Sequence, residues 1–144
     1  MNVRDFTQEQ GSFGEELIGI IAQKNNLGED VSHLFRAGRG GIDAAFLATD
    51  PAPRLTIVES KTSCWGTYPY SRLKKQGGSI YFKHLLKSLD YRHRDIQLHF
   101  QKLICTYPEL NLHFIRVETL IELTEDRFVV EDLKVKSWKD SINK

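Results

Sequence analysis

The chain has 144 residues, the usual size of one domain, and can bury a hydrophobic core without disulfides or a structural metal. Its hydrophobic content of 40% and charged content of 27% are typical of globular proteins and exclude a disordered or fibrous chain. The net charge of +1 argues against binding nucleic acid over the whole surface. We therefore expect a single domain over residues 1–144.

The cysteines and the apolar segments of the chain indicate the cellular compartment in which the protein acts. Cys64 and Cys105 lack CxxC spacing and a neighbouring His cluster, which disfavours a zinc site. The first residues contain no apolar segment of the kind found in secretory signals, and no apolar run approaches membrane-spanning length. These features predict no membrane association. They also predict action in a reducing cytoplasm, or arrival at the target by a route that this segment does not encode.

In chain order, the first predicted element is a helix over residues 11–26. Its apolar residues recur at helical spacing, and Ser12 and Glu15 fit a capping box at its start. Glycines at 38–41 and prolines at 50–53 indicate turns. Three strands separated by these turns are expected, at residues 31–35, 42–47 and 55–61. The last of the three is rich in β-branched residues, as suits a central strand.

The second half of the chain begins with an irregular segment at residues 62–78. Apolar residues then recur at helical spacing from residue 79 to about 105, with an interruption expected at 91–95. Strands at 112–117 and 128–135 close the chain. There is no internal repeat and no linker rich in Pro, Gly or Ser. The element order predicts an α/β fold class with a mixed central sheet flanked by helices.

The most informative feature is an acid, Asp43, near the start of one predicted strand, followed by Glu59-Ser60-Lys61 at the end of the next. Alternation puts Glu59 and Lys61 on one face, and the adjacent antiparallel strand can bring Asp43 opposite them. Two close carboxylates repel unless a cation or a shared proton compensates them. Such oxygen ligands suit Mg²⁺, with Mn²⁺ as a substitute, and Lys61 is suited to act on water and phosphate beside the metal. Phosphodiester hydrolysis requires these groups.

These residues and their element order resemble the PD-(D/E)xK nuclease superfamily. Its core has a Glu on a first helix, an Asp on the second strand of a meander, Glu-x-Lys on the third and a helix afterwards. The resemblance covers roughly the first two thirds of the chain. It extends to the restriction-endonuclease-like toxin domains of bacterial polymorphic toxins and secreted effectors, on the segments FGE at 13–15, GGID at 40–43, IVESK at 57–61 and QGG at 76–78. The Pro of the motif name is Ile42 here.

The resemblance implies a restriction-endonuclease-like core in the order α-β-β-β-α-β. It implies an Mg²⁺-dependent nuclease, and more closely a DNA endonuclease of the toxin or effector type, for which a cognate immunity protein would be a fitting partner. Asp43 and Glu59 would be metal ligands, with the backbone carbonyl of Ser60 as a third. Lys61 would be the catalytic lysine. Glu15 would be the acid on the first helix, with Glu16 as the alternative at that place.

Alternatives remain at the sequence level. An E-x-K triplet by itself is usually a solvated strand edge with an ion pair. The same family fold serves RNA-cleaving toxins, with tRNA as a substrate. A catalytically inactive module that binds nucleic acid or a protein partner is a further alternative, although intact Asp43, Glu59 and Lys61 speak against it. A restriction or repair nuclease without a toxic role fits the same residues.

Positive charge concentrates between residues 72 and 94, directly after the catalytic strand. This asymmetry predicts a basic face for nucleic acid, although any single lysine in the run is as readily part of a solvated helix face. The candidate nucleic-acid-binding residues are Arg39, Arg72, Lys74, Lys75, Gln76 and Lys83. Trp65, Tyr68 and Tyr70 could stack on unpaired bases, with core or lid packing as the more common use of such residues.

Overall fold

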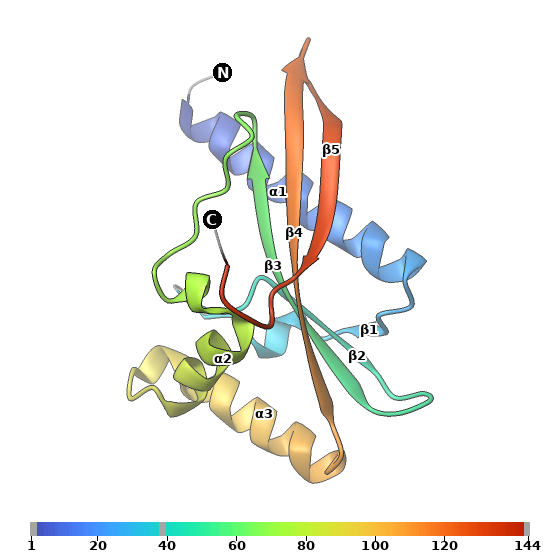
Figure 1. The fold of residues 1–144 in the computed structure, drawn as a ribbon, viewed down its shortest axis with the longest axis vertical. Coiled ribbons are helices and arrows are strands. Elements are labelled where there is room, and N and C mark those ends of the chain that lie inside the picture. Colours follow the sequence, from blue (N-terminus) through green and yellow to red (C-terminus); the bar gives the residue numbers. More distant parts are fainter. Residues whose placement is uncertain (1–2, 38–39, 143–144) are drawn as a thin grey trace.

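The computed structural model describes residues 3–37 and 40–142, and of residues 3–13 it describes the backbone alone. Three α-helices and a five-stranded sheet make up the described part of the chain (Figure 1). No helix among these residues is both long and apolar enough to cross a membrane.

The first helix, α1 (Val3–Lys24), begins before the helix predicted over residues 11–26. Ser12 and Glu15 lie inside it, so the predicted capping box is wrong. Residues 3–10 contain Arg, Glu and two Gln, whose straight side chains lose little freedom in a helix, and this favours extension of the helix upstream.

The five strands pair in the order β1-β2-β3-β4-β5, so each strand lies beside its neighbours in sequence. They are β1 (Glu29–Asp30), β2 (Ala44–Ala48), β3 (Arg54–Ser63), β4 (Asn111–Thr124) and β5 (Arg127–Ser137). β3 and β4 are parallel and the other pairs are antiparallel, so the sheet is mixed. The predicted α/β class with a mixed sheet is confirmed at this level. β4 and β5 continue past the end of β3 as a two-stranded ribbon.

Residues 31–35 do not form the predicted strand, because Ser32–Leu34 is a short 3-10 helix, η1. Asp30 Oδ1 accepts hydrogen bonds from the Ser32 backbone N–H at 2.9 Å and from its hydroxyl at 2.5 Å, a local turn that competes with strand pairing. Val31 and Phe35 are nevertheless buried in the core. The apolar pattern correctly indicated burial and wrongly indicated a strand.

The helical pattern after residue 78 is divided into α2 (Gly78–Lys87) and α3 (Arg94–Thr106), with the 3-10 helix η3 (Tyr91–His93) between them. The break begins at Ser88, slightly before the predicted interruption. Ser88 and Asp90 accept hydrogen bonds from backbone N–H groups two residues ahead, which stops the helix. The two helices provide the crossover that the parallel pairing of β3 and β4 requires.

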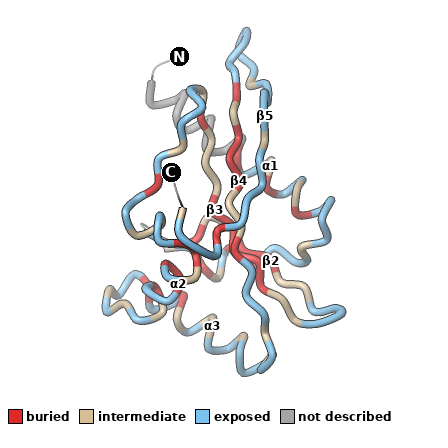
Figure 2. The backbone as a smooth tube through the Cα atoms, in the orientation of Figure 1, coloured by how far each residue is buried: buried red, intermediate tan, exposed pale blue. Residues whose placement is uncertain are grey.

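Helices cover both faces of the sheet (Figure 1). Ile18 and Ala22 of α1 pack against one face, with Val58 of β3 in their cluster. Phe82 of α2 packs against the other face, with Ile57 of β3 in its cluster. Buried residues accordingly run along the middle of β3 and β4 (Figure 2). Since side chains alternate along a strand, Glu59 and Lys61 lie on the α2 side of β3, where the candidate chemistry is.

Candidate active site

The structure brings Asp43 and Glu59 together. The pairing of β2 with β3 ends at Ala44 and Val58, and one further step of the same register puts Asp43 opposite Glu59. Asp43 Oδ2 accepts a hydrogen bond from the backbone N–H of Ser60 at 2.8 Å, which fixes its carboxylate at the open end of the hairpin. The expectation that these two acids converge rested on strand alternation alone, and the geometry agrees with it.

Glu59 is one of the most buried residues of the protein, with 1% of its surface exposed. Burial raises its pKa to about 8, and the hydrogen bond to Asp43 and the charge of Asp43 act in the same direction. The Lys74 ammonium lowers the pKa but does not outweigh these effects. In the metal-free protein Glu59 therefore holds a proton near neutral pH.

Lys74 completes this cluster from the other side. It belongs to the short 3-10 helix η2 (Lys74–Gln76), and its Nζ lies 2.7 Å from Glu59 Oε2. The ion pair is short but misaligned, so that within the described part of the chain no donor is aligned to hydrogen-bond this buried oxygen. Burial alone would lower the pKa of Lys74, yet Glu59 and Asp43 raise it above its ordinary value. Trp138 Nε1 donates to the Lys74 carbonyl at 3.0 Å and holds η2 in place.

Lys61 lies on the same face of β3 as Glu59, two residues further along. Its described contact is with Tyr70, whose ring centroid is 5.6 Å from Nζ. The ammonium is therefore directed toward the loop after β3 and does not join the two acids as expected, and Lys74 is the cation paired with Glu59. Lys74 was expected on the nucleic-acid surface. No periodicity or motif in the sequence could indicate this position, because an irregular loop carries Lys74 back over β3.

The backbone of Ser60 faces the same edge of β3 as Asp43. Residues of a strand direct N–H and C=O to the same neighbour, and the Ser60 N–H points to Asp43, so its carbonyl lies on that side too. The pairing with β2 has ended there, which leaves this carbonyl beside the acidic pair. This is the position that a third oxygen ligand would need.

The first helix packs closely on β3, on the face opposite Glu59 and Lys61. A Cβ on Gly14 would lie 2.5 Å from Thr62 Oγ1, so only glycine permits this contact between α1 and β3. Glu15, the next residue, lines a cavity of about 50 Å³ together with Asp43 and Arg36. Glu15 and Glu16 are both exposed, but only Glu15 is among the described residues around that cavity, so the geometry favours Glu15 as the helix acid.

Four of the other predicted nucleic-acid-binding residues are on the surface. Arg72, Lys75 and Gln76 are exposed on the segment between β3 and α2, and Lys83 is exposed on α2. Arg39 falls outside the described residues.

A second buried acid, Glu118, was missed by sequence reasoning. It lies in register with Lys61 on β4, is 5% exposed, and accepts from Tyr70 Oη at 2.7 Å, Arg116 Nη1 at 3.2 Å and Lys136 Nζ at 3.0 Å. Burial alone would raise the pKa of Glu118, but these donors and the two cations outweigh it and lower the pKa. The alternation of apolar and charged residues from 115 to 118 was the available signal.

The acidic pair suits a hard divalent cation. Asp43, Glu59 and the Ser60 carbonyl offer oxygen donors, and the buried Oε2 of Glu59 has the Lys74 ammonium nearby but no aligned hydrogen-bond donor among the described residues. The described residues contain no group of three or more His, Cys, Asp and Glu side chains that could hold a metal. An ion held here would complete its coordination with water and substrate, as Mg²⁺ usually does.

Comparison with known proteins assigns no family to this chain. No protein-family model matches the chain, and none of the curated proteins or solved structures matches it significantly. The site must therefore be interpreted from its own chemistry.

Proposed function

We propose that this protein is a metal-dependent nuclease that hydrolyses phosphodiester bonds of nucleic acid, with DNA as the principal substrate. The observation that carries the proposal is the buried Glu59 facing Asp43 beside a lysine. Burying a carboxyl group against another acid is costly, and proteins retain such pairs mainly where a cation or proton transfer uses them.

The arrangement of elements supports the same proposal. A helix with Glu15, a hairpin with Asp43 at its open end, and a central strand with Glu59 and Lys61 are the parts of a restriction-endonuclease-like core, which we propose as the finer fold. The toxin or effector role belongs to this proposal too and rests on the sequence resemblance alone.

Each residue has a task in this proposal. Asp43 and Glu59, with the Ser60 carbonyl, would hold Mg²⁺, which would polarise the phosphate and lower the pKa of water. Lys61 would orient the attacking water or offset charge on the phosphate, a role that requires its ammonium to leave the Tyr70 ring. Lys74 supplies the positive charge that holds Glu59 while the metal is absent. Glu15 would extend the acidic site from the helix.

Cleavage assays test the proposal directly. Purified protein is incubated with plasmid DNA and with total tRNA, each in Mg²⁺ and in EDTA. We expect Mg²⁺-dependent cleavage, faster on DNA, and a loss of at least roughly 100-fold in Asp43→Asn and Glu59→Gln. Glu109→Gln, an exposed acid outside the site, is the matched control. Cleavage in EDTA, or full activity in either site variant, would overturn the proposal; faster cleavage of tRNA would move the substrate to RNA.

A further inference from the structure

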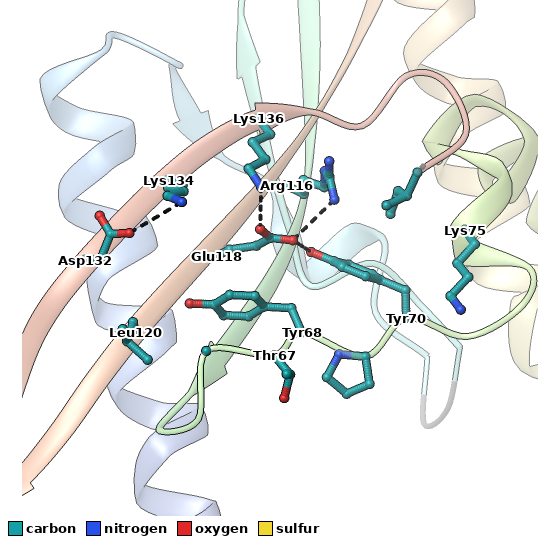
Figure 3. Close-up of a pocket in the computed structure, with 13 residues that line it drawn as sticks. Thr67, Tyr68, Tyr70, Lys75, Arg116, Glu118, Leu120, Asp132, Lys134 and Lys136 are labelled. Carbon is teal, nitrogen blue, oxygen red and sulfur yellow. Dashed lines mark hydrogen bonds and ion pairs between the residues drawn. The ribbon is translucent and has the colours of Figure 1, made fainter. Parts of the chain in front are cut away.

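A cavity of about 610 Å³ lies next to the acidic site and plays no part in the chemistry proposed above (Figure 3). One wall is the loop after β3, with Tyr68 and Tyr70, and the other is formed by β4 and β5, with Arg116 and Lys136. The volume falls in the range of small-ligand sites. It is more than enough for one nucleotide.

The cavity and the acidic site share one face of the sheet. Register pairs Glu59 with Arg116 of β4, and Arg116 with Lys136 of β5. Cross-strand partners lie on the same face, and neighbouring strands are roughly 5 Å apart. The cavity therefore begins about one strand from Glu59, the separation expected of neighbouring groups along a single substrate chain.

Positive charge dominates the cavity wall. Four cations, Lys75, Arg116, Lys134 and Lys136, face two acids, Glu118 and Asp132. Arg116 and Lys136 are both engaged with Glu118. Lys134 pairs with Asp132 at 3.8 Å in a largely exposed contact, which is weak. Lys75 has no ion pair with the described residues. Lys75 and Lys134 are thus available to a phosphate.

The two tyrosines differ in what they can do. Tyr70 is buried, its hydroxyl donates to Glu118, and its ring lies between Lys61 and Arg116, with both cations within 5.8 Å of its centroid. It is a fixed wall. Tyr68 is half-buried, and its ring projects from the loop toward β4 and β5 (Figure 3). Aromatic rings in basic grooves stack on unpaired bases of any sequence.

We propose that this cavity binds an unpaired nucleotide of the substrate next to the bond that is cut, with its base stacked on Tyr68 and its phosphate held by Lys75 and Lys134. This inference rests on the proposed function, because it places the nucleotide next to a bond that the acidic site would cleave. It adds a substrate class: strands with an unpaired nucleotide at the cleavage position, in preference to continuous duplex. An acidic protein segment is the alternative occupant of the cavity. A nucleotide base stacks on Tyr68 and an acidic segment does not, so a Tyr68 variant distinguishes the two occupants.

Binding in EDTA tests the cavity without cleavage. Fluorescently labelled single-stranded DNA, RNA of the same sequence and a blunt DNA duplex are titrated with the full chain at several salt concentrations. We expect the single strands to bind at least roughly 10-fold more tightly than the duplex. Tyr68→Leu should weaken single-strand binding roughly 5- to 100-fold and leave duplex binding unchanged. Tyr91→Leu, an exposed tyrosine elsewhere, is the matched control.

The salt dependence of single-strand binding tests the proposed phosphate contacts. Changing Lys75 and Lys134 together to Ala should reduce the salt slope of single-strand binding by up to about 1.4, or 0.7 per contact, whereas changing Lys24 and Lys102, two exposed lysines away from the cavity, to Ala should leave it unchanged. Equal affinity for duplex and single strand, or no effect of Tyr68→Leu, would overturn the cavity assignment. The cavity assignment would also be overturned if a polyglutamate peptide displaced the single strand equally well from the wild-type protein and from Tyr68→Leu. If Mg²⁺ yields no cleavage but the Tyr68 effect persists, the proposed function fails and the cavity assignment stands.

Discussion

Glu59 and Glu118 are both buried glutamates on the same face of the sheet, on the parallel neighbours β3 and β4, yet their pKa values move in opposite directions. Glu118 is surrounded by a hydroxyl and two cations that together satisfy its charge. Glu59 faces another acid and one misaligned lysine.

The difference separates a structural acid from a reactive one. A buried charge that its neighbours satisfy contributes to the fold, whereas one that they leave uncompensated is suited to bind a cation or carry a proton. Burial alone would not have distinguished Glu59 from Glu118. Lys61 is in register with Glu118 and two residues from Glu59. Whether it serves the reactive acid or the structural one is therefore the first test of this comparison.

The largest expected effect concerns turnover in Lys61→Ala. If Lys61 serves the acidic site, its loss should lower turnover by about 10²- to 10⁴-fold and leave Mn²⁺ affinity unchanged, because the lysine acts on water and phosphate and does not hold the ion. Lys102→Ala, an exposed lysine on α3, is the control. Normal turnover with lowered stability would instead place Lys61 with Glu118 as a structural residue.

A second effect, on stability, is expected in Glu118→Gln. Removing one partner of a fully buried ion pair costs roughly 3–5 kcal/mol, but Lys136 is 42% exposed and can rehydrate, so we expect a loss of about 2 kcal/mol in the free energy of unfolding at pH 7. The folded-state pKa of Glu118 is lowered, so its contribution is present above the ordinary value of 4.5 and is lost as the pH falls below it. Chemical denaturation at pH 7 and pH 4 should show the difference shrinking in acid; a constant difference would contradict the assigned charge pairing.

A third effect has the opposite sign and concerns Glu59→Gln. The folded-state pKa of Glu59 is raised, so its contribution to stability is present below 4.5 and is lost as the pH rises through about 8. Over that interval the metal-free wild type should lose up to about 1.4 kcal/mol per pH unit relative to Glu59→Gln. Thermal unfolding in EDTA between pH 5 and pH 9 measures this. Parallel curves for the two proteins would show that Glu59 is not held protonated.

Strand alternation was enough to predict the convergence of Asp43 and Glu59, because a hairpin of known register has few alternatives. β2 and β3 were placed within two residues of their observed ends. Lys74 and Glu118 were not predictable in their observed roles. The first is brought to the site by an irregular loop, and the second depends on the parallel pairing of β3 with β4 across two helices. Patterns along the chain carry no signal for such long-range arrangements.

The central claim is that Asp43 and Glu59 form a metal site that holds a proton while empty. Calorimetric titration of Mn²⁺ into the protein at pH 7, in two buffers of different ionisation enthalpy, counts the protons released on binding. Because the pKa of Glu59 is about 8, we expect one binding site and the release of about one proton per ion, and Glu59→Gln should bind more weakly and release none. Absence of binding at millimolar Mn²⁺, or proton release that persists in Glu59→Gln, would contradict the claim.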